Sequence, residues 1–318
     1  MEELTVVFVS HNDLGLACLE ELETLGANVR AVYTRPRGAN IADQTDFRPF
    51  ADQAGADHHA VESVNDADVI AQMRSYEPDL LFVVGWSRLV TQTVIGVPAI
   101  AALGMHPAPL PRGRGRAPVA WSLIKGLDET ALSCFHLVEA ADAGDLVGQQ
   151  SIDIDIEDDA GALYEKVVAA GRELIREYYP RFANGEVPRL PQDEDAATWW
   201  PARRPHHGLI DWTRSPMAVY NWIRGQSHPY PGAYSHLDGR RVTIWAANPP
   251  SGQPMFAKPG RIEYRDGDAL GIGAFEGVIE VTRIQIEDDE SPASALLQEY
   301  DVAVGDTFEN ARDGLDRR

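Results

Sequence analysis

The sequence predicts an α/β protein in which a mostly parallel, doubly wound sheet is followed by a smaller β-rich domain. In the first half of the chain, apolar runs of strand length alternate with stretches of helical periodicity, which is typical of a parallel sheet covered on both faces. Two later segments alternate apolar and polar residues, as strands near a sheet edge do. Beyond residue 202, short β-rich segments follow one another closely, which favours a small barrel or sandwich.

The same patterns place the individual elements. In the first domain we expect strands at 4–10, 29–33, 80–84, 100–105, 133–138 and 149–156, with helices ending near 25 and spanning 47–55, 69–75 and 161–179. In the second we expect a helix at 217–224 and strands at 233–237, 241–247, 261–264, 269–273 and 278–286. The stretch between them is rich in Pro, Asn, Gly and acids. We therefore predict domains at 1–182 and 203–318, joined by a linker at 183–202.

The composition narrows the classes of function. The 318 residues carry a net charge of −21, which is typical of an acidic solvated surface and opposes nucleic-acid binding, because phosphates need a basic face. The apolar runs are too short to cross a membrane and the N-terminus lacks the features of a signal peptide, so we expect a cytoplasmic protein. Cys18 and Cys134 have no metal-ligand spacing, and the doublet His206-His207 has no third ligand nearby, so we expect no metal.

One histidine stands at the end of a predicted buried strand, and an acid follows it in a later loop. His106 ends the strand, and Asp142 opens the turn Asp142-Ala-Gly-Asp145. Ligand sites in open α/β sheets lie at the carboxyl ends of strands, and a histidine there can transfer a proton at neutral pH. The pair is our catalytic candidate, suited to an amine attacking an acyl carbon. A structural histidine and a turn-forming aspartate are the alternatives.

A proline- and arginine-rich stretch follows His106. Arg112, Arg114 and Arg116 offer planar guanidinium groups that suit carboxylates or phosphates. Internal ion pairing within an acidic protein is the alternative role for these arginines.

Together these residues resemble the folate-dependent formyltransferase family, which includes methionyl-tRNA formyltransferases and sugar-nucleotide N-formyltransferases. The matching motifs are His106, Leu110-Pro111, Arg114-Gly-Arg-Ala-Pro118 and Asp142-Ala-Gly144, then Gln192-Asp-Glu194 with Ala197-Thr198, Gly208-Leu-Ile-Asp-Trp212 and His228-Pro-Tyr-Pro-Gly-Ala233. Their order spans about residues 4–285. The resemblance implies a Rossmann-like catalytic domain and an OB-like C-terminal domain.

The resemblance also implies roles for these positions. The co-substrate would be 10-formyltetrahydrofolate, with no metal. His106 would accept a proton from the incoming amine, and Asp142 would support it. The folate would contact Trp86, Arg88, Leu89, Val90, Arg116, Val138, Glu139, Ala140 and Ala141. The candidates for binding the acceptor substrate are His11, Arg112 and Arg114.

The sequence departs from the family at one position. An asparagine that precedes the histidine by two residues in the family is Gly104 here. The side-chain amide of that asparagine would donate to the oxyanion of the tetrahedral intermediate. Losing one such donor costs on the order of 10²–10³ in turnover. We expect an enzyme nonetheless. A formyltetrahydrofolate hydrolase and a non-catalytic folate- or nucleotide-binding relative are the alternatives.

Two acceptors compete. Residues 34–46 contain only two arginines, and residues 201–318 hold 13 Lys and Arg against 17 Asp and Glu, which does not suit a tRNA backbone. The first loop, Ser10-His-Asn-Asp-Leu-Gly15, resembles the sugar-nucleotide branch, and the loop motifs look closest to the enzyme that formylates UDP-4-amino-4-deoxy-L-arabinose. We therefore expect an amino-sugar nucleotide as the acceptor, with methionyl-tRNA as the alternative.

Overall fold

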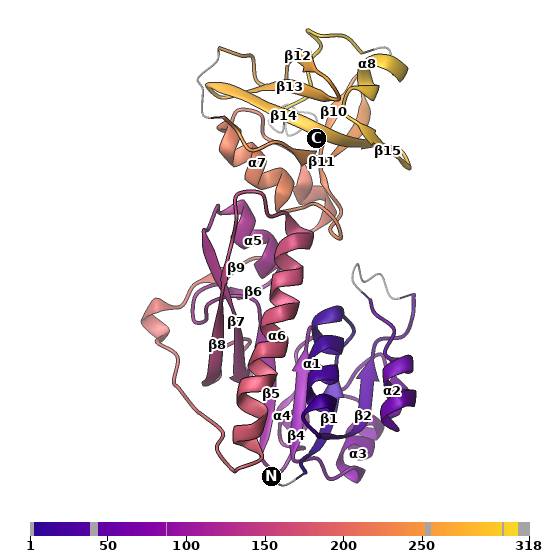
Figure 1. Cartoon of the computed structure of the whole chain (residues 1–318), viewed down its shortest axis with the longest axis vertical. Coiled ribbons are helices and arrows are strands. Elements are labelled where there is room, and N and C mark those ends of the chain that lie inside the picture. The colour runs from indigo at the N-terminus through magenta and orange to yellow at the C-terminus, as the bar shows by residue number, and fades with distance from the viewer. Residues whose placement is uncertain (1–2, 39–43, 87, 252–255, 301, 311–318) are drawn as a thin grey trace. The chain divides into compact units, whose positions relative to one another are not determined.

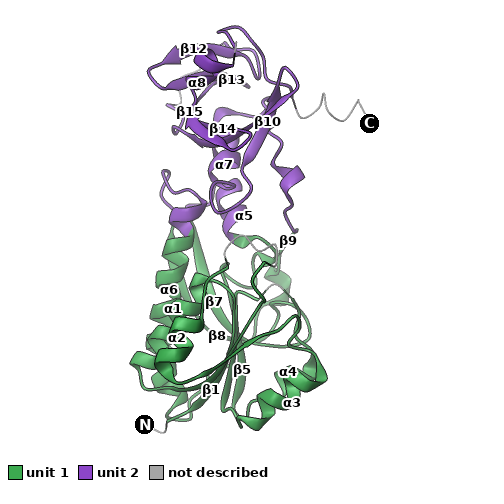
Figure 2. Ribbon diagram, turned by 90° about the vertical axis from the view of Figure 1, so that its right-hand side faces the viewer, with its two compact units in different colours: residues 1–118, 129–153, 164–201 green, residues 119–128, 154–163, 202–318 purple. Residues whose placement is uncertain are grey.

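The computed structural model describes residues 3–38, 44–86, 88–251, 256–300 and 302–310 (Figure 1). The chain separates into two compact units (Figure 2). Unit 1 comprises residues 1–118, 129–153 and 164–201, and unit 2 comprises residues 119–128, 154–163 and 202–318. Each unit has its own sheet and its own core, so the two are described separately.

Unit 1 is built on a seven-stranded sheet with the order β3-β2-β1-β4-β5-β7-β8. The first five of these strands in chain order run parallel, and β7 runs antiparallel to both of its neighbours. The strands are β1 (Thr5–Val9), β2 (Asn28–Thr34), β3 (Asp57–Ala60), β4 (Leu80–Val84), β5 (Ala101–His106), β7 (Glu129–His136) and β8 (Leu146–Asp153). The predicted mostly parallel sheet is confirmed.

Helices cover both faces of this sheet, with α1 and α6 on one side of the strands and α3 and α4 on the other (Figure 2). The helices are α1 (Asp13–Thr24), α2 (Arg48–Ala54), α3 (Ala67–Ser75), α4 (Gln92–Ile95) and α6 (Ala160–Phe182). Helices α1 and α6 pack closely at Gly171 of α6. A Cβ on this glycine would lie only 2.5 Å from Leu14 and 3.1 Å from Cys18 of α1. On the opposite face Val69, Ile70 and Met73 of α3 join a buried apolar cluster with residues of β1 and β4.

Some elements of unit 1 differ from the prediction. Strand β7 begins at Glu129 and not at 133, and its residues from Thr130 onward are continuously buried instead of alternating. Edge strand β3 was not predicted, because Asp57-His-His-Ala60 carries no apolar pattern. The segment at 183–202 contains β9 (Trp199–Trp200), which pairs in parallel with β6 (Arg114–Gly115). Such two-residue pairings depend on tertiary contacts and have no sequence signature.

Unit 2 is an antiparallel β domain with the strand order β10-β11-β14-β13-β12, and β15 pairs with β14. The strands are β10 (Ala233–Leu237), β11 (Arg240–Ala247), β12 (Ile262–Asp266), β13 (Ala269–Ala274), β14 (Gly277–Ile286) and β15 (Asp289–Pro292), and the helices are α5 (Pro118–Ile124), α7 (Pro216–Arg224) and α8 (Ala295–Glu299). Trp212 is fully buried in the core of this unit. The predicted β-rich second domain is confirmed.

Both cysteines are buried and unpaired. No helix within the described ranges has the length and apolar character needed to span a membrane.

Candidate functional site

The strand that carries the candidate histidine lies in the middle of the unit 1 sheet. His106 is the last residue of β5, which is flanked by parallel β4 and antiparallel β7. All six residues of β5 are buried, so the strand is held firmly along its length. A side chain at the end of such a strand is fixed more precisely than one in a loop.

The proline–arginine loop (residues 107–117) follows β5 and is anchored by two polar side chains of the sheet. Ser133 on β7 donates to the Ala108 carbonyl (2.6 Å) and accepts from the Leu110 amide (3.2 Å). Gln149 on β8 pairs with Ser133 in the strand register and donates to the Leu110 carbonyl (2.9 Å). These contacts make the loop a rigid extension of the sheet.

The loop fixes the orientation of the His106 ring. Its Nε2 lies 2.8 Å from the Gly113 carbonyl oxygen, and a carbonyl can only accept, so Nε2 carries the proton. The neutral ring therefore presents Nδ1 as its unprotonated nitrogen. His106 is only 7% exposed, so the ring has little freedom to turn.

Asp142 lies beside this free nitrogen. Its Oδ1 is 3.8 Å from Nδ1 of His106, and its Oδ2 accepts a hydrogen bond from the Gly115 amide (2.9 Å). The first distance is too long for a direct hydrogen bond but suits an ion pair once the ring is protonated. The structure thus brings the two candidate catalytic residues together from separate segments.

Two glycines allow this close approach. Gly115 has φ +109°, and a Cβ on it would lie 2.4 Å from the Trp200 carbonyl oxygen. A Cβ on Gly144 would lie 1.8 Å from the His136 carbonyl oxygen. Any larger residue at either position would displace the loop that holds Asp142.

Apolar side chains fill the space beside Gly104. A Cβ on this glycine would lie 2.8 Å from Leu137 Cδ2 and 3.2 Å from the ring of Phe135. An asparagine side chain would therefore not fit at position 104 unless Leu137 moved. The glycine and its apolar neighbours Leu137 and Phe135 form one packed unit.

The three arginines of the proline–arginine loop differ in their surroundings. Arg112 and Arg116 are exposed. Arg114 is 2% exposed, and its guanidinium binds both carboxylate oxygens of Glu194 and the side-chain oxygen of Gln192. The internal ion pairing considered as an alternative is therefore present at Arg114.

A second group of candidates gathers at the ends of β1 and β4. His11 is buried, and its ring centroid lies 5.9 Å from that of Trp86, over which Arg35 also stacks at 5.9 Å. The indole N–H of Trp86 is buried and has no hydrogen-bond partner among the described residues. An unpaired buried donor costs about 1–3 kcal/mol, so it marks a place where a ligand acceptor would be stabilising.

The remaining folate candidates lie on the two loops next to these groups. Val90 is buried in the apolar cluster, whereas Leu89 is exposed and Arg88 donates to the Glu62 carbonyl. Val138, Glu139 and Ala140 are exposed and Ala141 is half-buried, in the acidic loop (residues 138–145) that leads to Asp142. No group of three His, Cys, Asp or Glu side chains suited to a metal occurs within the described ranges.

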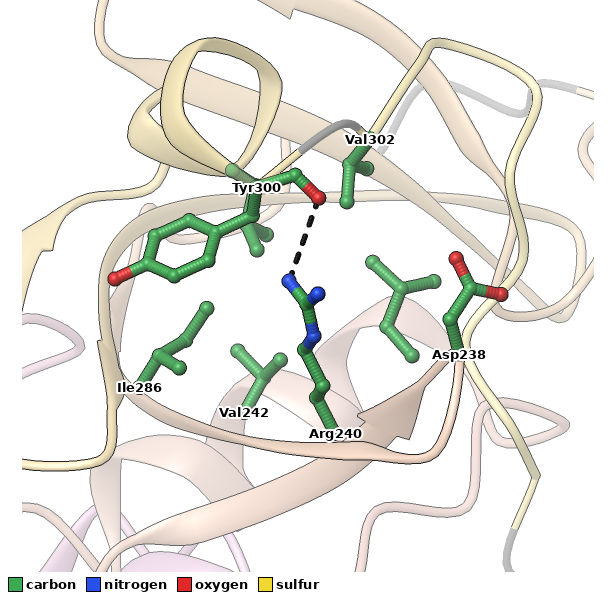
Figure 3. A pocket seen from close by; sticks show the side chains of 8 residues that line it. Asp238, Arg240, Val242, Ile286, Tyr300 and Val302 are labelled. Atoms are coloured by element: carbon green, nitrogen blue, oxygen red, sulfur yellow. Dashed lines mark hydrogen bonds between the residues drawn. The ribbon is translucent and has the colours of Figure 1, made fainter.

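A separate hollow of about 150 Å³ lies in unit 2 (Figure 3). Its walls are mostly apolar, and the side chain of Arg240 reaches toward the backbone carbonyl of Tyr300 at 3.5 Å. None of the candidate site residues lines it. The candidate catalytic and binding residues therefore all lie in unit 1.

Sequence reasoning missed several residues that build the site. Ser133 and Gln149 face each other on neighbouring strands, and polar residues within a buried strand were the available signal. Gln192, Glu194 and Thr198 belong to motifs that the resemblance singled out, but they lie in the stretch predicted to be a linker. The sequence does not indicate their contacts with residues 50–85 positions earlier.

Sequence comparisons identify related proteins. A model of the formyl transferase family matches residues 5–178, and a model of the formyl transferase C-terminal domain matches residues 203–300. A methionyl-tRNA formyltransferase from Geobacter metallireducens is 30% identical over 292 residues, covering 90% of this chain and 92% of that protein.

Solved structures share the fold. HypX from Aquifex aeolicus, in complex with tetrahydrofolic acid, matches with a TM-score of 0.68 at 20% identity. The match covers 95% of this chain but only 48% of HypX. An N-formyltransferase from Helicobacter canadensis, in complex with folinic acid and dTDP-3-aminofucose, matches with a TM-score of 0.66 at 14% identity over 88% of this chain and 99% of that one.

Proposed function

The chain belongs to the folate-dependent formyltransferase family and is a formyl-transferring enzyme, and from this premise we propose that it moves a formyl group from 10-formyltetrahydrofolate to the amine of an amino-sugar nucleotide. The observation that carries the proposal is the approach of His106 Nδ1 to Asp142 at 3.8 Å, with Nε2 held by the Gly113 carbonyl. This arrangement leaves one basic nitrogen and one carboxylate facing the same space. We assign the catalytic domain to residues 1–182, the linker to 183–202 and an OB-like domain to 203–318.

His106 acts as the general base. As the amine nitrogen bonds to the formyl carbon, it becomes positively charged and must lose a proton, which Nδ1 of His106 takes. The tetrahedral intermediate then collapses with cleavage of the bond between the formyl carbon and N10 of the folate. The proton held on His106 returns to N10 as that nitrogen leaves, so the products are the formamide and tetrahydrofolate.

Asp142 stabilises the protonated histidine. The imidazolium that forms during attack lies 3.8 Å from a carboxylate oxygen, and the opposite charge favours this charged form. The Gly115 amide holds the other carboxylate oxygen, so the charge stays directed at the ring.

The oxyanion of the intermediate meets an apolar wall at position 104. Leu137 and Phe135 fill that space, and glycine itself has no side-chain amide to donate. We propose that the imidazolium of His106 itself stabilises the negative charge. This makes the reaction more dependent on His106 than in a relative that has the asparagine.

The folate site is proposed to lie along Trp86, Arg88, Leu89 and Val90, with Arg116 and the stretch 138–141. The buried, unpaired indole N–H of Trp86 supports this assignment, since a folate acceptor atom would satisfy it. HypX is in complex with tetrahydrofolic acid and the Helicobacter canadensis protein with folinic acid, which supports a folate co-substrate here.

The charge distribution favours a small acceptor over a tRNA. Of the arginines in the loop at 34–46, Arg37 pairs with Asp46 and Arg35 with Glu62. A hydrogen bond from Arg48 lowers the pKa of Asp46 to about 2, so this carboxylate stays ionised. Residues 39–43 of the loop, including Asp43, lie outside the described residues.

The Helicobacter canadensis protein is in complex with dTDP-3-aminofucose, which further supports an amino-sugar nucleotide as the acceptor. We propose that His11 and Arg112 contact this acceptor.

Methionyl-tRNA is the second candidate acceptor, favoured by the 30% identity to the Geobacter metallireducens enzyme. Binding tRNA would require a basic surface, and the net charge of −21 opposes it. The cytoplasmic setting expected from the sequence stays a prediction.

An acceptor panel separates these functions. The protein is incubated with 10-formyltetrahydrofolate and, in separate reactions, with UDP- and dTDP-linked amino sugars, methionyl-tRNA or no acceptor, and release of tetrahydrofolate is followed. We expect release only with an amino-sugar nucleotide. Release with methionyl-tRNA alone would contradict the proposed acceptor, release without an acceptor would indicate a hydrolase, and no release in any reaction would indicate a binding protein.

A further inference from the structure

The return segment (residues 188–200) crosses both loops of the candidate site within unit 1. Its β9 pairs with β6 of the proline–arginine loop, and Thr198 accepts from the Gly113 amide through its hydroxyl (2.9 Å) and from the Arg114 amide through its carbonyl (2.9 Å). The Trp200 carbonyl accepts from the Arg116 amide (3.0 Å). The segment is therefore held against the same loop that fixes His106.

Arg114 links this segment to the interior of the site. Its guanidinium binds Glu194 at 2.6 and 2.8 Å and the Gln192 side-chain oxygen at 2.8 and 3.2 Å. The hydrogen bonds to Arg114 lower the pKa of Glu194 and raise that of Arg114, so the pair stays ionised at neutral pH. Two donor contacts from this buried guanidinium fix the side-chain oxygen of Gln192, and the other two hold Glu194.

Gln192 in turn forms hydrogen bonds with the backbone of the acidic loop. Its amide nitrogen donates to the Asp142 carbonyl (2.8 Å) and to the Gly144 carbonyl (2.7 Å). The oxygen of the amide is occupied by Arg114, so both ends of the side chain are used. Asp142 itself has a left-handed backbone, with φ +56°, that its neighbours must hold in place.

We infer that Gln192 is a positioning residue for formyl transfer: oriented by Arg114 and Glu194, it holds the backbone of Asp142 so that the carboxylate faces His106. This rests on the proposed function, in which Asp142 stabilises the protonated histidine. The amide nitrogen of Gln192 donates to the backbone carbonyls of Asp142 and Gly144, so its effect on the carboxylate passes through that backbone. A displacement of about 1 Å at a catalytic group can cost about 10²-fold in rate.

The Gly115 amide gives a readout that needs no substrate. It donates to the Asp142 carboxylate at 2.9 Å, so its hydrogen-exchange rate reports whether that carboxylate is in place. In protein labelled with ¹⁵N-glycine, the Asp142→Asn variant identifies the signal. We expect Gln192→Ala and Gln192→Glu to speed exchange of the Gly115 amide by about tenfold or more, because a hydrogen bond to a charged group is lost.

The two substitutions control for each other. Gln192→Glu keeps nearly the same side-chain size and an oxygen that accepts from Arg114. It removes the N–H donors to the Asp142 and Gly144 carbonyls, so it tests these hydrogen bonds without creating a cavity. Glu177→Gln breaks the exposed Arg181–Glu177 pair on α6 (2.9 Å) and should leave Gly115 unchanged. Thermal unfolding confirms that each variant is folded at the temperature of measurement.

Kinetics then distinguish positioning from general stabilisation. We expect both Gln192 variants to lower kcat by about 10²-fold while KM for 10-formyltetrahydrofolate changes by less than about twofold. In the Asp142→Asn background, adding Gln192→Glu should have no further effect on kcat.

The inference is overturned if Gly115 exchanges at the wild-type rate in both Gln192 variants, or if the kcat losses of Gln192→Glu and Asp142→Asn multiply. Failure of the proposed function gives a different pattern. Wild-type protein would then transfer no formyl group to any acceptor, while the exchange measurement would still decide whether Gln192 holds Asp142.

Discussion

Among the described residues, a histidine–carboxylate ion pair occurs in each unit, and these two pairs contrast. In unit 1, His106 and Asp142 are separated by 3.8 Å, with side chains 8% and 17% exposed. In unit 2, His228 and Glu290 are closer, at 3.2 Å, but their side chains are 63% and 30% exposed. The shorter contact therefore belongs to the more exposed pair.

The contrast shows that distance alone does not identify a catalytic pair. His228 stacks on Trp245 at 3.8 Å between ring centroids, and Glu290 also binds Arg283, so its carboxylate is already shared. His106 instead has one nitrogen fixed by a carbonyl and the other left free. A fixed tautomer leaves one defined nitrogen available to accept a proton, which suits a general base.

The largest expected effect comes from making the same substitution in both histidines. His106→Gln keeps a donor for the Gly113 carbonyl but removes the base, so kcat should fall by about 10²–10⁴. His228→Gln should leave kcat within about twofold. Equal losses in steady-state assays with the two variants would contradict the distinction between the pairs.

Replacing the two acids tests the same contrast at smaller amplitude. Asp142→Asn removes the charge that favours the imidazolium, and we expect kcat to fall on the order of 10²-fold. Glu290→Gln breaks two exposed contacts and should change the free energy of unfolding by less than about 1 kcal/mol, with kcat unaffected. An Asp142→Asn enzyme with wild-type kcat would show that the carboxylate has no part in the reaction.

Substitutions at Gly104 and Leu137 test how the unit 1 site stabilises the oxyanion. Gly104→Asn alone forces a side chain against Leu137, at a cost of about 1–3 kcal/mol in stability. Gly104→Asn combined with Leu137→Ala makes room for the amide and should raise kcat by about tenfold or more. Leu137→Ala alone is the control. A double variant no faster than this control would mean that the oxyanion is already fully stabilised.

The buried His136 is expected to make the stability of the fold depend on pH. Burial lowers the pKa of His136 below 6.5, and nearby Arg189 adds to this effect. The unfolded chain therefore takes up a proton first, so the stability from His136 is present above about pH 6.5 and declines as pH falls. We expect Tm to drop less between pH 7.5 and 5.5 in His136→Gln than in wild type. An identical drop in the two proteins would contradict this assignment.

The framework of both units could be predicted from sequence because it depends on local patterns. Strands such as β4 and β5 are unbroken apolar runs, and α1, α6 and α7 have clear periodicity. The convergence of His106 and Asp142 was also predicted, because a strand end and a turn are recognisable in sequence. The orientation of the His106 ring was not, since it depends on the Gly113 carbonyl seven residues away.

The roles of Gln192 and Glu194 could not be predicted in the same way. Their partners Arg114 and Asp142 lie 50–80 residues earlier, and the stretch that contains Gln192 and Glu194 has the composition of a linker. Only the folded arrangement shows that this stretch packs on the site. The filling of the space beside Gly104 by Leu137 and Phe135 is likewise a matter of packing across neighbouring strands.

The tautomer of His106 is the most direct test of the central claim. The ¹⁵N NMR signals of the imidazole nitrogens, assigned by their loss in His106→Gln, report which nitrogen carries the proton in the neutral ring. We predict that Nε2 is protonated and that Nδ1, facing Asp142, is not. A neutral ring protonated at Nδ1 would leave no base facing the carboxylate and would contradict the proposed mechanism.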